Sequence, residues 1–445
     1  MTCLKSGCQN TCSTKPDTCP NLTHCEWSRT MLLYRILSSL DKFYLTEKRK
    51  AQTRNPSPPT SSQIGKGVGF TSGPSFLFPI PAAPIPKPSG QREMQLLSFF
   101  RGLAWILSTS TTEPGLLDLL KFSLLDVAID EFLRNDSISD LSERMELSAS
   151  FLACLESIGK NPRLAEFYNT PREEMASSDG LELIIAGQGQ KRSMGEGSNS
   201  QIPKIVPLLE LMDKLARQAE TFCRTAENAH AHRQLNVGDV TVMDSMNLSR
   251  SILAVRQLLH MTSSQAGSTV QTTVASASSV QEVYRLRCFD LAYDEISTTS
   301  SSLYYYYGAL ANSITAVNPR RTITLAKELS TMATSLPPGI FVRNFPNRPD
   351  CIKALIAGPE DTPYFGGLFE FDIFATANYP AEPPKVHLLT TSQNRVRFGP
   401  NLYAYYPLLS ETDAVTVKYV CLCLALGQDP PTNSGSLINP RLCRF

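Results

Sequence analysis

The sequence predicts an α+β protein in which helical segments and linkers precede a final domain, made of one helix and a four-stranded antiparallel meander. Two observations predict this plan. Apolar residues recur at three- and four-residue spacings over residues 94–170 and 204–262, as on the buried face of amphipathic helices. After residue 320, one such helix is followed by short runs in which apolar and polar residues alternate, as in half-buried strands. A helix followed by an antiparallel meander is an α+β arrangement.

The composition is that of a folded chain with long connecting segments. Of 445 residues, 42% are hydrophobic and 19% are charged, and the 31 prolines indicate linkers. Lysine plus arginine total 42 and aspartate plus glutamate 41, so the net charge of +1 gives no electrostatic argument for a nucleic-acid partner. No apolar stretch approaches the roughly 18 residues of a membrane span. The first residues lack the apolar run of a secretory signal, so we expect a soluble, cytoplasmic protein.

Residues 1–93 are predicted to form a disordered leader rich in cysteine and proline. The segment 54–91 is rich in Pro, Ser and Gly and has no helical or alternating period. Zinc sites favour cysteine pairs two to four residues apart, and only Cys8 and Cys12 have such a gap. We therefore predict no metal site, and a zinc site here is the minority alternative. The five cysteines of this leader are Cys3, Cys8, Cys12, Cys19 and Cys25.

Two predicted helical segments and their linkers fill the middle of the chain. In the segment 94–170, Ser137 is placed as a helix start and Gly159 as a stop. Residues 171–203 and 263–279 are polar and read as linkers on either side of the segment 204–262. No cluster of catalytic residue types occurs in these segments, so a scaffold role is the default.

Residues 280–320 are predicted to be a helix, ending near residue 296, and a connector. The tyrosine run 304–307 lacks the basic residues that accompany base stacking, so we expect it to pack on the final domain or to form a strand beside it. Three histidines, His230, His232 and His260, raise the alternative of a metal site. His230 and His232 lie two residues apart and would diverge on a helix, which favours solvated side chains.

The final domain is predicted over residues 321–445. Its helix covers residues 321–334, and its strands cover 339–343, 351–357, 368–374 and 385–391. In the third strand, Phe369, Phe371 and Ile373 share one face. A rigid proline-rich segment, YPAEPPK, lies between the last two strands and cannot be mid-strand.

Three motifs in this domain resemble the signature of the ubiquitin-conjugating enzymes. They are GPEDTPY at residues 358–364, GLFEFDI at 367–373 and YPAEPPKV at 379–386, in the family's order and spacing. The later element RFGPNLY, at 397–403, is similar to the family's His-Pro-Asn element, with Gly399 in place of the histidine. This element resembles the subfamily of very large conjugating enzymes. The helix over residues 321–334 and, more faintly, the leucine-rich helices near 116–135 are similar to the carboxy-terminal part of the giant inhibitor-of-apoptosis/ubiquitin-conjugating hybrid.

The resemblance implies a mechanism and partners. Such enzymes receive ubiquitin from an activating enzyme as a cysteine thioester and pass it to a substrate lysine. The family's asparagine, here Asn401, supports the oxyanion, and the loop carrying Pro380, Pro383 and Pro384 meets the ligase or activating enzyme. The resemblance implies no cofactor, since ATP is used by the activating enzyme. It implies ubiquitin, an activating enzyme, a ligase and substrate proteins as partners.

The sequence departs from the family at the nucleophile. The family's cysteine lies eight residues after the asparagine, where this chain has Leu409. The nearest local match is VCLCL at residues 420–424, so Cys421 is the candidate nucleophile and Cys423 takes the place of a small polar neighbour. The alternative is that both are buried strand cysteines.

The region after Cys421 also differs from the family, which continues with further helices. The 24 residues that remain are polar and have no helical period, so we expect a domain that is incomplete at its carboxy end. An intron read as coding sequence, or a truncated gene model, explains both anomalies. Three readings therefore stay open: a conjugating enzyme, an inactive variant that binds proteins of the ubiquitin pathway, and a helical scaffold whose last domain does not fold.

Overall fold

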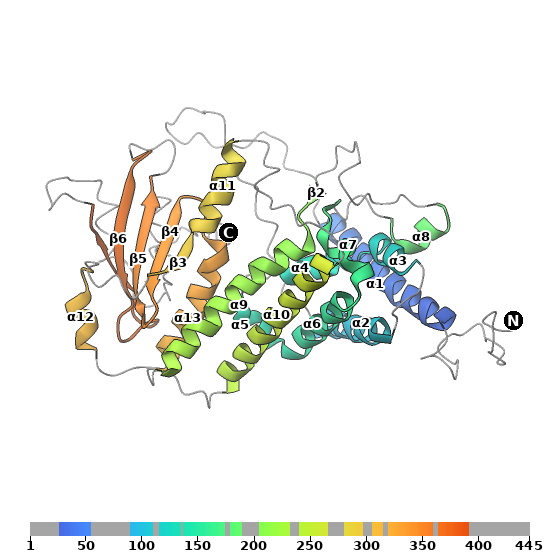
Figure 1. Cartoon of the computed structure of the whole chain (residues 1–445), viewed down its shortest axis with the longest axis horizontal. Helices are drawn as coiled ribbons and strands as arrows, with labels where there is room; N and C mark the ends of the chain where they lie inside the picture. Colours follow the sequence, from blue (N-terminus) through green and yellow to red (C-terminus); the bar gives the residue numbers. More distant parts are fainter. Residues whose placement is uncertain are drawn as a thin grey trace. The chain divides into compact units, whose positions relative to one another are not determined.

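The computed structural model describes residues 26–54, 90–109, 115–134, 137–173, 179–188, 204–231, 240–265, 280–296, 305–314, 319–358 and 364–390 (Figure 1). The chain divides into two compact units. The first is Met1–Ile129 with Thr170–Pro207, and the second is Asp130–Asn169 with Leu208–Phe445. These units do not follow the predicted segments, because the helical segment 94–170 is shared between them.

The first unit is mainly helical. Its helices are α1 (Glu26–Arg54), α2 (Gly90–Thr109), α3 (Leu116–Phe122) and α8 (Leu181–Ile185), and α4 (Leu125–Leu133) begins in it. Two short strands, β1 (Arg172–Glu173) and β2 (Lys204–Ile205), pair antiparallel.

Helix α1 corrects the prediction of a disordered leader over residues 26–54. Leu33, Leu37, Leu40 and Tyr44 are buried along one side of this helix, at spacings of four, three and four residues, which is the period of an amphipathic helix. Helix α8 likewise lies inside the segment 171–203 that was predicted as a linker. In both cases a short periodic signal is surrounded by residues typical of linkers.

The second unit begins with a group of helices. They are α5 (Ile138–Glu143), α6 (Met145–Gly159), the 3₁₀ turn η2 (Pro162–Leu164), α7 (Ala165–Asn169), α9 (Leu208–Ala231) and α10 (Val240–Gln265). Ser137 begins α5 as predicted, because its hydroxyl accepts a hydrogen bond from the Asp140 backbone N–H. Gly159 ends α6 against α10, where a Cβ would lie 2.9 Å from a methyl carbon of Leu259. Only a glycine permits this approach without displacement of the neighbour.

The final domain contains the sheet. After α11 (Val280–Leu291) come β3 (Tyr293–Glu295), α12 (Gly308–Ser313) and α13 (Pro319–Ser335), and then β4 (Ile340–Phe345), β5 (Arg348–Ala357), β6 (Leu368–Phe374) and β7 (Lys385–Leu388). The strand order is β3-β4-β5-β6-β7. Strands β4 to β7 form the predicted antiparallel meander, and the α+β prediction is confirmed.

A fifth strand was not predicted. Residues 293–295, assigned to the end of a helix, instead form β3, which pairs in parallel with β4. Helix α11 therefore ends at Leu291, five residues before the predicted end. The phenol of Tyr293 donates a 2.8 Å hydrogen bond to the buried Asn344 of β4, which fixes the added strand to the meander.

The core of this domain lies between the sheet and α13. Phe369, Phe371 and Ile373 are 8%, 1% and 0% exposed. They belong to one cluster with Leu325 and Leu329 of α13, so this helix covers the apolar face of the sheet. Helix α9 packs against α13, and Gln218 of α9 donates a 2.5 Å hydrogen bond to the Thr334 hydroxyl.

Candidate functional site

The proline loop, which we define as residues 375–384, connects β6 to β7 and is anchored by one tyrosine. Tyr379 is 1% exposed and lies in the same core cluster as the sheet residues. Its hydroxyl donates a hydrogen bond to the Glu328 carboxylate of α13. The peptide bond between Tyr379 and Pro380 is cis. The loop is thus attached to the helix that covers the sheet.

The tip of the proline loop is exposed. Ala381 and Glu382 are exposed, Pro380 and Pro383 are partly exposed, and Pro384 is buried. Of the three prolines predicted to meet a partner, Pro384 therefore packs inside the domain, while the other two border the exposed tip.

Hydrogen bonds within the tip hold its shape. The backbone N–H of Ala381 donates to the Asn378 carbonyl at 2.8 Å. The Asn378 side-chain amide donates to Glu382 Oε1 at 2.7 Å. This hydrogen bond holds the pKa of Glu382 below its ordinary value. The tip consequently presents an ionised carboxylate at neutral pH.

A charged network occupies the opposite face of the sheet from the core. Lys353 Nζ lies 2.8 Å from Asp372 Oδ1 and 2.9 Å from Glu370 Oε1. The Asp372 side chain is fully buried and that of Lys353 is 9% exposed. Burial alone would lower the pKa of Lys353, but its hydrogen bonds to Asp372 and Glu370 raise it above the ordinary value. Lys353 therefore stays protonated at neutral pH and lies, nearly buried, on the face of the sheet opposite the core.

Residues 305–307, which we term the tyrosine strap, cover this network. The Tyr306 backbone N–H donates to Asp372 Oδ2 at 2.6 Å, and the Tyr305 hydroxyl donates to the Ile373 carbonyl at 2.7 Å. The Tyr306 ring stacks on His387 with centroids 3.5 Å apart. The expectation that these tyrosines pack on the final domain is confirmed for Tyr305–Tyr307, whereas the strand beside the meander is β3.

The candidate nucleophile and its oxyanion partner, Cys421 and Asn401, lie outside the described residues, as do Leu409 and Cys423. The cysteines that the structure describes, Cys154, Cys223, Cys288 and Cys351, are buried free thiols. Burial raises the pKa of Cys154 and of Cys351 to about 12, which disfavours the reactive thiolate. None of these four has the character of a nucleophile.

The residues considered for a metal are only partly described. The amino-terminal cysteines from Cys3 to Cys25, His232 and the His230 side chain lie outside the described part. The ring of His260 is 2.7 Å from Asp213 Oδ1, which also accepts from Arg256. Within the described ranges, no group of three or more His, Cys, Asp or Glu side chains is placed to hold one metal ion.

None of the helices described is long and apolar enough to cross a membrane.

Comparison with known families agrees with this architecture. Residues 324–406 match the family "Ubiquitin-conjugating enzyme". The matched segment runs from α13 through the meander and the proline loop to the element that contains Asn401. The carboxy-terminal part of this chain is therefore similar to ubiquitin-conjugating enzymes both in sequence, over residues 324–406, and in its α+β architecture.

Individual relatives extend the similarity. The chain is 29% identical over 289 residues to the Caenorhabditis elegans "Probable ubiquitin-conjugating enzyme protein 17", covering 61% of this chain and 36% of the relative. It is 27% identical over 313 residues to the human "Dual E2 ubiquitin-conjugating enzyme/E3 ubiquitin-protein ligase BIRC6", covering 65% of this chain and 6% of that protein. Human "Ubiquitin-conjugating enzyme E2 Z" is 42% identical over 87 residues, 19% of this chain and 24% of that protein.

The length of these alignments shows where the similarity lies. The family match covers 83 residues (324–406), and 39 residues of the chain follow it. An alignment of 289 residues therefore includes residues upstream of the match. The helical segment 204–262 is thus part of what this chain shares with the C. elegans and human proteins, although the chain spans only about a third of the first and 6% of the second.

Proposed function

We propose that this chain is a ubiquitin-conjugating transferase. It accepts ubiquitin as a thioester on Cys421 and passes it to a lysine of a substrate protein. The observation that carries the proposal is the family match over residues 324–406, which extends through Asn401. The described part of that match has a buried core and a proline loop anchored to α13, and these would support the segment that carries Asn401 and Cys421.

The proposed reaction has two acyl transfers. The Cys421 thiolate attacks the ubiquitin carboxy-terminal carbonyl in its thioester with the activating enzyme, and the activating enzyme's thiolate leaves. A lysine amine then attacks the new thioester, the Cys421 thiolate leaves, and the amine loses a proton as the isopeptide bond forms. A thiolate suits both steps because it is a strong nucleophile and a good leaving group. Asn401 donates a hydrogen bond to the oxyanion, a role whose loss typically costs about 10²–10³ in rate.

The exposed tip of the proline loop is the proposed contact for the activating enzyme or a ligase. Ala381 and Glu382 supply exposed surface, and Pro380 and Pro383 border it. The carboxylate of Glu382, held ionised by Asn378, adds a negative charge to this surface. Such a charge favours a partner with a basic contact residue.

One observation favours a second candidate function, an inactive variant that binds proteins of the ubiquitin pathway. Eight residues after Asn401 the chain has Leu409, and Cys421 comes twelve residues later. Lengthening the connection from eight to twenty residues costs only ~0.8 kcal/mol of loop-closure entropy. Catalysis is more demanding, because a 1 Å misplacement of a reacting group costs roughly 10²-fold in rate.

The two candidates differ in one assay. The full chain is incubated with activating enzyme, ATP and ubiquitin, and the products are separated with and without a thiol reductant. The transferase forms an adduct that the reductant removes, and Cys421→Ala abolishes it while the matched control Cys423→Ala retains it. The inactive variant binds ubiquitin or the activating enzyme and forms no adduct.

A further inference from the structure

A small cavity lies between the first turn of α13 and the start of β5. It has a volume of about 80 Å³, and its lining includes Ile314, Arg321, Thr322, Leu325 and Arg348, with Asp350 at its charged end. One water molecule needs roughly 10–15 Å³ of such space. The cavity is therefore large enough for a bound group larger than water.

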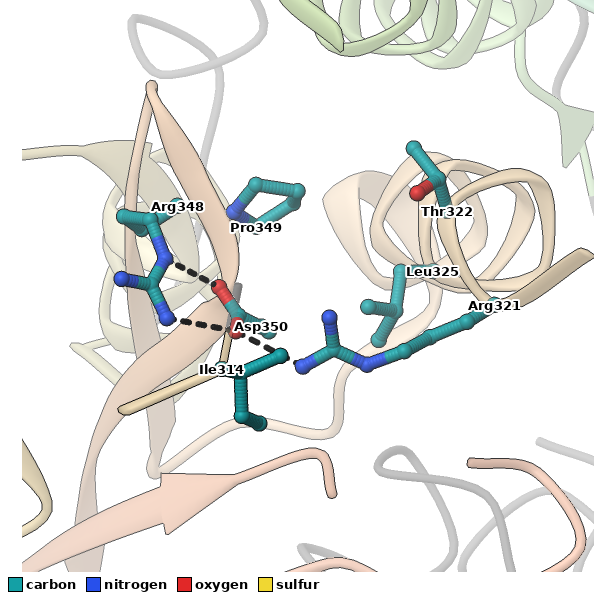
Figure 2. Close-up of a pocket in the computed structure, with 7 residues that line it drawn as sticks. All are labelled: Ile314, Arg321, Thr322, Leu325, Arg348, Pro349 and Asp350. Atoms are coloured by element: carbon teal, nitrogen blue, oxygen red, sulfur yellow. Dashed lines mark hydrogen bonds and ion pairs between the residues drawn. The ribbon is translucent and has the colours of Figure 1, made fainter. Parts of the chain in front are cut away.

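Two guanidinium groups meet one carboxylate at this cavity (Figure 2). Arg321 extends from α13 and lies with its Nη2 2.7 Å from Asp350 Oδ2, and Arg348 approaches the same carboxylate from the other side, with its Nη2 at 2.8 Å. Burial alone would raise the pKa of Asp350, but the hydrogen bonds and charges of the two arginines keep it below its ordinary value. The carboxylate is ionised, and among the described residues no other charged side chain lines the cavity. The cluster consequently carries a net charge of +1.

Of the two guanidinium groups, that of Arg321 is poorly solvated, whereas that of Arg348 is partly exposed. The Arg321 side chain is 7% exposed, and its Nε is buried and has no hydrogen-bond partner among the described residues. Its Nη2 donates to Asp350 and to the Ala375 carbonyl. A buried charge without full compensation is costly, and so is a buried donor without an acceptor.

The helix that provides Arg321 adds to the positive potential. Arg321 and Thr322 lie in the first turn of the 17-residue α13, and that turn carries no acidic residue. The amino-terminal end of a helix carries a partial positive charge that favours anions. A small oxyanion in the cavity would accept from the unpartnered Nε and balance the excess charge.

We infer that this cavity binds a small oxyanion, a phosphate or a carboxylate. Guanidinium groups recognise both through charge-assisted hydrogen bonds. The site is separate from the proposed thioester chemistry, since neither Cys421 nor Asn401 contributes to it. The ion pair between Arg321 and Asp350 already joins α13 to β5, and a bound anion would offset the excess positive charge at this junction.

The test is a calorimetric titration of the full chain with inorganic phosphate, acetate and chloride at one ionic strength. Saturable binding of phosphate or acetate, but not chloride, is the expected result. Comparing the Kd for phosphate with the Kd for acetate shows whether the cavity prefers a phosphate or a carboxylate. Arg321→Lys keeps a charge beside Asp350 but removes the Nε donor, so the Kd should rise about tenfold or more. Ile314→Phe should abolish binding by filling the cavity without removing either guanidinium group.

The matched control is Arg343→Lys, on a partly exposed arginine of β4 that donates to backbone carbonyls and does not line the cavity. It should bind phosphate as the parent does. Equal behaviour of phosphate, acetate and chloride would overturn the inference. Parent-like affinity in both the Ile314→Phe and the Arg321→Lys variants would overturn it as well, because the anion would then bind elsewhere.

Discussion

The phenol of Tyr379 in the proline loop donates a hydrogen bond to the carboxylate of Glu328 in α13, 51 residues away. This bond joins the loop to the helix that covers the core face of the sheet. The Tyr379→Phe variant keeps the buried ring and removes only the hydroxyl. Since hydrogen bonds to charged groups contribute roughly 1.5–3 kcal/mol, we expect the free energy of unfolding to fall by about that amount, measured by denaturant titration.

The control for this prediction is Tyr306→Phe. Tyr306 is 48% exposed, and its contacts with Asp372 and His387 use its backbone N–H and its ring. We therefore expect a change within about 0.5 kcal/mol. Equal effects of the two variants would show that the bond to Glu328 contributes little.

The ion pair between Lys353 and Asp372 predicts a larger effect. Asp372 is fully buried, so Lys353→Met leaves a buried carboxylate without its cation. Removing one partner of a buried ion pair typically costs about 3–5 kcal/mol. Denaturant unfolding should show this loss for Lys353→Met and almost none for Lys385→Met, whose side chain is exposed at the start of β7. If Lys353→Met leaves the free energy of unfolding unchanged, the tyrosine strap does not exclude water from Asp372.

Contact of the tyrosine strap with His387 predicts a pH dependence. Burial lowers the pKa of His387 from its ordinary 6.5, and nearby Asp372 opposes this shift only in part. A lowered pKa in the folded state means that stability is complete above pH 6.5 and is lost as the pH falls through the lowered value. Asp350 and Glu382 have pKa values below their ordinary 3.8 and 4.5, so they titrate in a more acidic range.

We expect the free energy of unfolding to decrease between pH 7.5 and 5.5 in the parent chain. The His387→Phe variant retains an aromatic partner for Tyr306 and cannot be protonated, so this decrease should become smaller. Unfolding titrations at several pH values measure the difference. Identical pH profiles for the parent and the variant would contradict the role given to His387.

In the first unit, Asp41 connects α1 to two other segments. Its Oδ1 accepts a 2.7 Å hydrogen bond from the Leu124 backbone N–H, and its Oδ2 accepts one of the same length from Leu181. Asp41→Ala leaves two buried donors unpaired, at roughly 1–3 kcal/mol each. Proteolysis within α8 should become faster in this variant, whereas the exposed neighbour Ser39→Ala should behave as the parent does.

Local periodicity predicted the meander well. Strand β6 has the predicted bounds, Leu368–Phe374, because Phe369, Phe371 and Ile373 alternate with polar residues and face one core. Strand β3 was not predictable in this way. Three residues carry too little pattern to distinguish a strand from a helix end, and β3 exists through its pairing with β4 about fifty residues later.

In the candidate site, too, some features could be predicted from local sequence and others depend on the packing of distant segments. The proline loop follows from its own residues, because proline restricts the backbone locally. The partners of its anchor do not, since Tyr379 meets Glu328 only after α13 has packed on the sheet. The cluster of Arg321 and Asp350 likewise joins residues 29 apart. No spacing rule within one element relates such pairs.

The central claim is that Cys421 carries ubiquitin, and intact-mass spectrometry with peptide mapping tests it most directly. After incubation with activating enzyme, ATP and ubiquitin, the chain should gain the mass of one ubiquitin minus one water, and the modified peptide should contain Cys421. Cys421→Ser should give an ester that survives a thiol reductant, in place of the labile thioester. An unmodified Cys421 under conditions that charge a known conjugating enzyme would contradict the account.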